Sequence, residues 1–226
     1  MSSVSARTTD ADRIEAAGVV GAGGAGFPTH IKARGAADVV IANGVECEPV
    51  LSKDKAIMRA CPGDVVSGLA VMMGCVGASR GIIAVKRKNS REVEAMKAAA
   101  RGHANVAVAE VGDYYPAGDE HVLVYELIAR VVPAGGIPLQ VGAVVSNVET
   151  LLNVGNAVRD GTPVTHKYVT VAGEVKRPGT FRVLVGTSLA RLIEAAGGVR
   201  GSLRGGFEVL LDGPMMGKAL PPGQDL

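Results

Sequence analysis

A glycine-rich segment near the N-terminus, residues 21–32 with the sequence GAGGAGFPTHIK, has the composition of a ligand-binding loop. Four of its first six residues are glycines, and glycine lets consecutive backbone N–H groups converge on one point without Cβ atoms in the way. Pro28 can open a short helix whose positive end faces the same point, and Lys32 adds a full charge one turn further on. The segment therefore predicts a cradle for a phosphate group, with a mobile glycine loop as the alternative.

The same segment also fits the pattern G-x-G-x-x-G of dinucleotide-binding folds through Gly21, Gly23 and Gly26. That pattern is meaningful only where a strand precedes it and a helix follows it directly. Residues 10–17 instead predict a capped helical turn, only two valines follow it, and Pro28 stands where the helix should already be running. We therefore exclude the standard dinucleotide-binding fold.

Three further polar clusters follow predicted strands, where open α/β sheets bind their ligands. Residues 43–49, NGVECEP, bring an amide and two carboxylates that suit hydroxyl groups and amide edges, unless they only form an acidic turn before a helix. Residues 114–120, YYPAGDE, place two acids at the start of a helix, where capping is the alternative. Residues 146–150, SNVET, end a strand, and Asn147 can also serve as a helix N-cap. Because the amide and carboxylates of the first cluster do not suit phosphate, we expect them to face a different part of the ligand from Lys32.

The elements that position these residues alternate between strands and helices up to about residue 160. Short β-branched runs predict strands at residues 38–43, 81–86, 106–109 and 142–146. Apolar spacing and capping residues predict helices at residues 10–17, 62–77, 90–100, 119–129 and 148–158. This alternation predicts an α/β fold with a mostly parallel sheet and helices on both faces.

The pattern changes after residues 159–163, which we interpret as a linker. Residues 168–174 and 180–185 flank a Pro-Gly turn and predict a β-hairpin. A helix at residues 189–196 and a strand at residues 206–211 follow, and this order predicts a small β-grasp arrangement. We therefore divide the chain into an α/β domain at residues 1–162 and a β-grasp domain at residues 163–226.

Composition places the chain among folded proteins without a strong overall electric field. The 226 residues carry a formal net charge of +2 with 47% hydrophobic residues, which excludes disorder and makes nucleic acid an unexpected partner. The basic run at residues 86–88 indicates a solvated edge. The three cysteines lack C-x-x-C spacing, so we expect no disulfide framework and no metal site. We find no apolar stretch of membrane-spanning length and no signal peptide, and we expect a cytoplasmic protein.

Taken together, the motifs have a family resemblance. In this order, GAGGAGFPTHIK, NGVECEP, YPAGDE and SNVETLLNV resemble the flavin-binding half of the RnfC and PduS type flavoproteins, and more distantly the NADH-binding flavin subunit of respiratory complex I. The spelling YPAGDE favours the PduS type, the cobalamin reductases of bacterial microcompartments. VAGEVKRPGT and LIEAAGG are similar to the soluble-ligand-binding β-grasp (SLBB) domain that follows in the same proteins. The segment GPMMG at residues 213–217 is similar to the one just before their ferredoxin-like region.

The resemblance implies FMN as the cofactor and NADH as the substrate. It assigns a loop around the flavin to Gly21, Gly23, Gly24, Ala25 and Gly26, with Lys32 beside it. The other implied flavin-lining residues are Asn43, Glu46, Gly118, Asp119, Glu120, Ser146 and Asn147. Phe27, Glu48 and Glu120 would meet the nicotinamide nucleotide. Hydride transfer needs orientation at van der Waals contact and no general acid, so we expect no catalytic side chain.

The implied function is an FMN-dependent NADH oxidoreductase that passes electrons through iron–sulfur clusters to cob(II)alamin or another acceptor. The cysteines of those clusters are absent from this sequence, so the clusters are expected in a region outside it. The expected partners are NADH, an iron–sulfur or corrinoid-enzyme acceptor and shell or cargo proteins of a microcompartment, in whose lumen the protein would lie. Two alternatives stay open: an RnfC-like subunit that couples NADH and ferredoxin to a membrane ion pump, and a non-catalytic ligand-binding or docking module.

Overall fold

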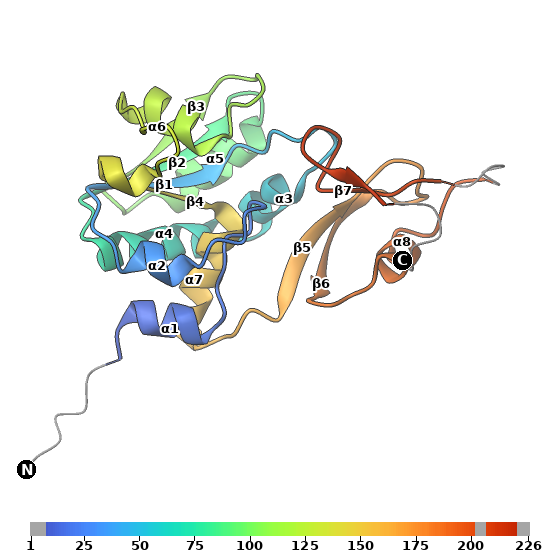
Figure 1. The fold of residues 1–226 in the computed structure, drawn as a ribbon, viewed down its shortest axis with the longest axis horizontal. Helices are drawn as coiled ribbons and strands as arrows, with labels where there is room; N and C mark the ends of the chain where they lie inside the picture. The colour runs from blue at the N-terminus through green and yellow to red at the C-terminus, as the bar shows by residue number, and fades with distance from the viewer. Residues whose placement is uncertain (1–7, 202–206, 221–226) are drawn as a thin grey trace, which may run out of the picture.

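A parallel β-sheet forms the centre of the first part of the chain in the computed structural model, which describes residues 8–201 and 207–220 (Figure 1). Its four strands are β1 (Val39–Gly44), β2 (Arg80–Lys86), β3 (Val106–Val111) and β4 (Ala143–Asn147). They lie in the order β3-β2-β1-β4, and all three neighbouring pairs are parallel. The carboxyl ends of β1 and β4 therefore lie side by side, with Asn43 opposite Asn147.

Helices cover both faces of this sheet, as predicted, because the strands are apolar on both sides. Val40 and Ala42 face a core shared with α1 (Asp10–Ala16), α2 (Thr29–Ala33), α3 (Lys53–Ala60), α4 (Pro62–Val76), α5 (Ser90–Ala99) and α7 (Val148–Asp160). Val39 and Ile41 face the second core, beneath α6 (Glu120–Ile128). Figure 1 shows α6 on one side of the sheet and α2, α4 and α7 on the other. The fold class predicted from the sequence is confirmed.

Close packing between α4 and α7 fixes where α7 begins. A side chain at Gly68 of α4 would overlap the carbonyl oxygen of Leu151 in α7, so the two helix backbones are in contact there. Asn147, the last residue of β4, is the N-cap of α7 and accepts a hydrogen bond from the N–H of Glu149. The strand end and the helix start thus form one rigid corner beside the glycine-rich loop.

A smaller unit follows the parallel sheet. The antiparallel hairpin of β5 (His166–Val171) and β6 (Gly179–Leu184) leads to α8 (Leu189–Ala195), which Ser188 caps. The strand predicted at residues 206–211 is shorter in the structure, because only β7 (Leu210–Leu211) pairs, with β8 (Lys218–Ala219). Gly206 lies outside the described residues. The domain boundary at residues 162 and 163 stays a prediction.

No single helix among the described residues is long and apolar enough to cross a bilayer. The pair α3 and α4, bent by 96°, passes the criteria of length and composition only when its two helices are taken together. Leu69, Met72 and Met58 of this pair are fully buried inside the fold.

Candidate functional site

The glycine-rich loop lies against the corner where β4 becomes α7. The N–H of Gly21 donates to the carbonyl of Phe27 at 2.8 Å, which closes the loop. The N–H of Ala22 donates to the hydroxyl oxygen of Thr150 in α7 at 2.9 Å, which holds the loop at the start of that helix. Gly24, with φ of 122°, has a backbone conformation that favours glycine. The sequence thus places a glycine, Gly24, where the loop changes direction beside the first turn of α7.

The next backbone N–H groups of the loop are free to bind a ligand. Within residues 8–201 and 207–220, the amides of Gly23, Gly24, Ala25 and Gly26 donate no well-formed hydrogen bond to a protein acceptor. Successive N–H groups of this kind, beside the positive end of a helix, form a site for an anion. All four residues are exposed, so their amides are accessible to solvent or to a bound anion.

Lys32 connects the loop to the ends of two other elements. Its ammonium donates to the carbonyl of Val145 in β4 at 2.8 Å and lies 3.8 Å from the carboxylate of Glu120 in α6. It also lies 5.4 Å from the centre of the Phe27 ring, within range of a cation–π contact. Burial lowers the pKa of Lys32, and the charge of Glu120 opposes that shift. Three residues predicted for the site, Phe27, Lys32 and Glu120, are therefore brought together.

The clusters NGVECEP and YPAGDE are also in contact. The side-chain amide of Asn43 donates to the carbonyl of Gly118 at 2.9 Å, and the N–H of Gly118 donates to the sulfur of Cys47 at 2.8 Å. A side chain at Gly118 would overlap the carbonyl oxygen of Val45, so only glycine fits between the two clusters. Asp119 is the N-cap of α6 and accepts from the amides of two residues of its first turn. The capping alternative accounts for the carboxylate of Asp119.

Two side chains in this region have buried oxygen atoms without a partner among the described residues. They are Oε2 of Glu46 and the hydroxyl of Ser146. The other carboxylate oxygen of Glu46 accepts from the N–H of Lys53 at 3.0 Å. Burial, together with the negative charge of Asp54, raises the pKa of Glu46 to about 7. Unpartnered buried polar atoms call for an explanation, and a polar ligand supplies one.

A network of buried charges lies behind these residues, and sequence analysis missed it. The ammonium of Lys53 donates to Asp54 at 2.7 Å and to Glu149 at 3.2 Å. Burial lowers the pKa of Lys53, but the carboxylates of Asp54 and Glu149 raise it by more, so the pKa is raised overall. The side-chain amide of Asn147 donates to Asp54 at 2.9 Å, so the network fixes that predicted site residue. The run SKDK after the NGVECEP cluster was the available signal.

The carboxylate of Glu48 is engaged by the C-terminal part of the described chain. It accepts from the backbone N–H of Met215 at 3.0 Å and from that of Met216 at 2.8 Å. These bonds hold the loop at residues 213–216 next to the NGVECEP cluster. The predicted contact between Glu48 and a nucleotide stays a prediction.

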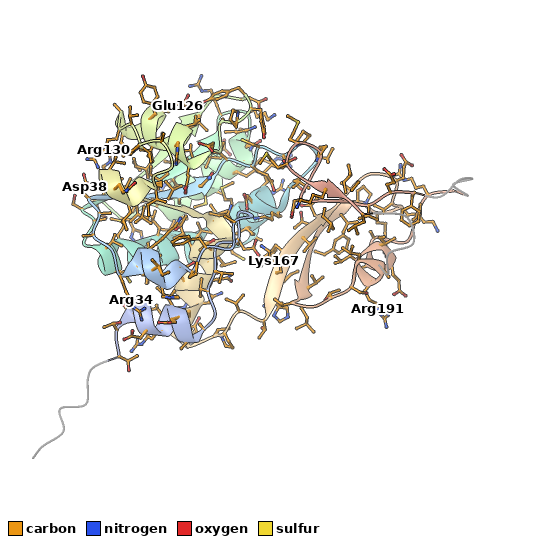
Figure 2. All side chains as sticks on the ribbon, viewed as in Figure 1. Arg34, Asp38, Glu126, Arg130, Lys167 and Arg191 are labelled. Carbon is orange, nitrogen blue, oxygen red and sulfur yellow. The ribbon has the colours of Figure 1, made fainter. Side chains whose placement is uncertain are left out.

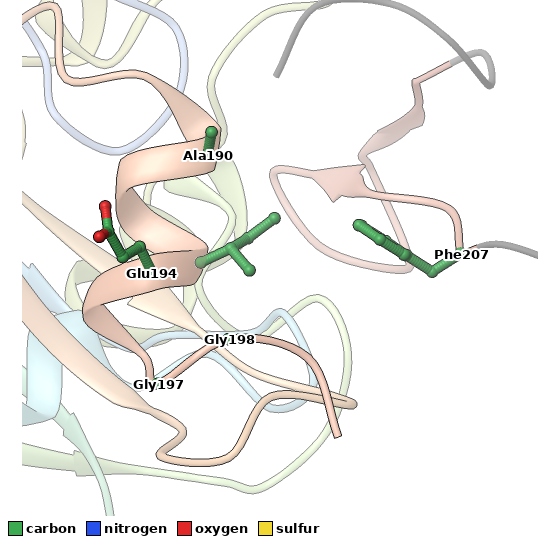
Figure 3. Close-up of a pocket in the computed structure, with 6 residues that line it drawn as sticks. Ala190, Glu194, Gly197, Gly198 and Phe207 are labelled. Atoms are coloured by element: carbon green, nitrogen blue, oxygen red, sulfur yellow. The ribbon is translucent and has the colours of Figure 1, made fainter. Parts of the chain in front are cut away.

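Two cavities lie near the surface. One, of about 350 Å³, is lined by residues 46–51 and by side chains that include Lys55, Lys86, Asp113 and Tyr115. Lys86 is only 6% exposed and pairs with Asp113 at 3.1 Å, so the prediction of a solvated edge for the basic run was wrong at this residue. The other, of about 500 Å³, lies in the second unit between α8 and Phe207 (Figure 3); its lining residues are Ala190, Ile193, Glu194, Gly197, Gly198 and Phe207.

In the described part of the chain, no group of three or more His, Cys, Asp or Glu residues could hold a metal ion.

Comparison with known proteins assigns this site to a class. Residues 14–156 match the model of the Nuo51 FMN-binding domain, and residues 168–219 match that of the SLBB domain. The chain therefore belongs to the family of Nuo51 FMN-binding domains, which confirms the resemblance and FMN as the cofactor of this family.

Individual relatives agree with this assignment. The cobalamin reductase PduS of Citrobacter freundii is 40% identical over 213 residues, which are 90% of this chain and 47% of the relative. One subunit of the proton-translocating ferredoxin:NAD(+) oxidoreductase complex of Clostridium ljungdahlii is 36% identical over 91% of this chain and 45% of the relative. An NAD+-reducing NiFe hydrogenase in the air-oxidized state is similar in structure, with a TM-score of 0.71 and 28% identity over 83% of this chain and 38% of the hydrogenase chain. The chain spans about half the length of the curated relatives it matches.

The residues present fit FMN. The amides of residues 23–26 without protein acceptors suit its phosphate, because they form an anion site. The unpartnered oxygens of Glu46 and Ser146 suit its polar parts, since each is buried and still lacks a hydrogen bond among the described residues. Both features point to the same region, where β1, β4 and α7 meet.

Proposed function

We propose that this chain is the FMN-binding and NADH-oxidising module of an electron-transfer protein. The observation that carries the proposal is the row of loop amides at residues 23–26 without protein acceptors, in a chain that belongs to an FMN-binding family. When bound, FMN supplies a centre that takes up two electrons with a hydride and returns them singly.

The residues divide the work of binding. Gly23, Gly24, Ala25 and Gly26 hold the phosphate through their amides, and Gly21 shapes the same loop because its N–H closes it on the carbonyl of Phe27. Lys32 is the nearby charge. The rest of the cofactor is surrounded by Asn43, Glu46, Gly118, Asp119, Glu120, Ser146 and Asn147. Phe27, Glu48 and Glu120 contact the nicotinamide nucleotide. The contact between the ammonium of Lys32 and Glu120 supports this arrangement, because it joins the cofactor side to the substrate side. The side chains orient the two reactants and exclude water; none has to move a proton for the hydride to transfer.

The acceptor we favour is cob(II)alamin, reached through iron–sulfur clusters in a region beyond this sequence. The 40% identity with the cobalamin reductase PduS supports it. We place the module in the cytoplasm, in the lumen of a microcompartment.

The second candidate is an RnfC-like role in NADH:ferredoxin electron transport, which the 36% identity with the Clostridium ljungdahlii protein supports over a similar length. Neighbouring genes for shell proteins and a diol dehydratase would favour the first role, and neighbouring genes for membrane Rnf subunits the second.

Anaerobic spectroscopy of the purified chain tests the proposal. We expect the chain to take up FMN, with the absorbance band of oxidised flavin in the visible, and we expect NADH to bleach that band. The Glu94→Ala variant, changed at an exposed residue of α5, serves as the matched control and should behave as the wild type. A chain that binds no flavin would favour the non-catalytic ligand-binding module instead.

A further inference from the structure

Both backbone groups of Ala22, the residue before the free loop amides, are held by other elements. Its N–H donates to the hydroxyl of Thr150 in α7 at 2.9 Å. Its carbonyl accepts from the ammonium of Lys167 at 3.3 Å. Lys167 belongs to β5, the first strand of the second unit, and Figure 2 labels it where that strand meets the first domain. The second unit thus reaches the loop through one side chain.

The position of the Lys167 ammonium is itself fixed. It donates to Oε2 of Glu149 in α7 at 2.8 Å, and the other oxygen of Glu149 accepts from the N–H of Tyr168 at 3.0 Å. Glu149 is only 1% exposed, whereas the Lys167 side chain is 41% exposed, so a surface lysine makes a charge-assisted bond to a buried carboxylate. Lys53 donates to the same carboxylate at 3.2 Å. Lys167 therefore bridges two fixed points, Glu149 and the carbonyl of Ala22.

Peptide geometry turns this contact into a constraint on the ligand side of the loop. A trans peptide is planar, so the carbonyl of Ala22 and the N–H of Gly23 point in opposite directions. With the carbonyl held on Lys167, the N–H of Gly23 is directed away from Lys167 and lies free among the loop amides. Without that bond the peptide could rotate, because glycine at position 23 imposes little restriction on its own backbone.

We infer that Lys167 is a positioning residue for the FMN phosphate, through which the second domain completes a cradle formed by the first. The inference rests on the proposed function, which places the phosphate at these amides. Lys167 acts through the Ala22–Gly23 peptide and through its charge. Its effect is therefore specific to the anionic end of the cofactor.

Lys167 is not the only contact that docks β5 on the first domain. The N–H of Ser52 donates to the hydroxyl of Thr170 at 3.1 Å, and the hydroxyls of Ser52 and Thr180 lie 3.1 Å apart. The N–H of Tyr168 on Glu149 adds a main-chain contact. Removal of the ammonium alone therefore leaves the second unit attached, and its consequences appear in phosphate binding.

Titration of the flavin-free full chain with FMN and with riboflavin, followed by flavin fluorescence, tests this inference, because riboflavin lacks the phosphate. We expect the Lys167→Met variant to bind FMN about five- to tenfold more weakly, as for loss of a charge-assisted contact, and to bind riboflavin as the wild type does. Lys167→Arg should restore most of the FMN affinity. Lys176→Met, at an exposed residue of the β5–β6 turn, should leave both affinities unchanged.

Two results would overturn the inference while the proposed function stands. One is an unchanged FMN affinity in Lys167→Met, and the other is an equal loss for FMN and riboflavin, which would assign Lys167 to domain docking alone. A wild-type chain that binds no FMN would overturn the proposed function and the inference with it. Riboflavin binding by the variant also reports that its site is folded.

Discussion

Replacement of Glu46 by glutamine in the flavin-free chain should change how stability depends on pH. In the folded chain, burial and Asp54 raise the pKa of Glu46 to about 7 from an ordinary value of 4.5. The folded state then holds a proton that the unfolded state has released, so the carboxyl contributes stability below pH 4.5 that is lost as the pH rises to about 7. At about 1.4 kcal/mol per pH unit, the loss across this interval amounts to about 3 kcal/mol. Glutamine cannot ionise and can still accept from the N–H of Lys53.

Urea unfolding of the wild type and of Glu46→Gln at a series of pH values measures this difference. Every other titrating group is common to the two chains, so the difference between their unfolding free energies isolates Glu46. We expect the glutamine variant to gain about 3 kcal/mol relative to the wild type between mildly acidic and neutral pH. The matched control is Glu94→Gln on the exposed side of α5, for which no such gain is expected.

A difference between the two chains that stays constant from acidic to neutral pH would refute this reasoning. It would mean that the carboxylate of Glu46 is solvated or well paired in the folded chain. If the variant instead loses stability relative to the wild type as the pH rises, the effect of Lys53 and Lys55 on the pKa of Glu46 outweighs that of burial. Their positive charges lower the pKa of Glu46 and already oppose the two effects that raise it.

Three further variants test the binding residues. Gly24→Val should weaken FMN binding about tenfold or more, because valine is strained at a φ of 122°; fluorescence titration measures the loss, and retained affinity would remove Gly24 from the cradle. Lys32→Ala should weaken FMN retention about tenfold, measured as flavin content after gel filtration, with Lys176→Ala as the control; unchanged content in both Gly24→Val and Lys32→Ala would contradict the loop assignment. Glu120→Ala should slow flavin reduction by NADH more than reduction by dithionite in stopped-flow measurements, and equal slowing would exclude a nucleotide-facing role.

The parallel sheet and most of its helices could be predicted because their signals are local. The strands are short β-branched runs, and α4 begins at Pro62 and ends before Gly77 in a left-handed cap, as its sequence predicts. Helix α3 (Lys53–Ala60) was not predicted, because its first turn carries charges and its apolar side is limited to a few residues. Asp54 in that turn is 5% exposed, whereas sequence patterns place charged residues in solvent.

The site could be predicted in part for the same reason. The glycine loop, Lys32 and the acids at the start of α6 stand in compact motifs, and the structure brings Lys32 and Glu120 within 3.8 Å. The charged partners of the Glu149 carboxylate are Lys53, 96 positions away, and Lys167, 18 positions away. No local pattern pairs such residues, because only the packing of α3 and β5 against α7 brings them together. Tertiary structure was therefore needed to find the charged network.

The position of Glu48 bears on how nucleotide binding and the second domain are related. A carboxylate has about four lone-pair sites, and two N–H groups, those of Met215 and Met216, occupy part of this capacity. The remaining sites can accept from a hydroxyl or amide group of a nucleotide without release of the loop at residues 213–216. Substrate contact and loop attachment are therefore compatible at one carboxylate. Because a bound nucleotide would share that carboxylate with the loop, its binding would be coupled to the position of residues 213–216.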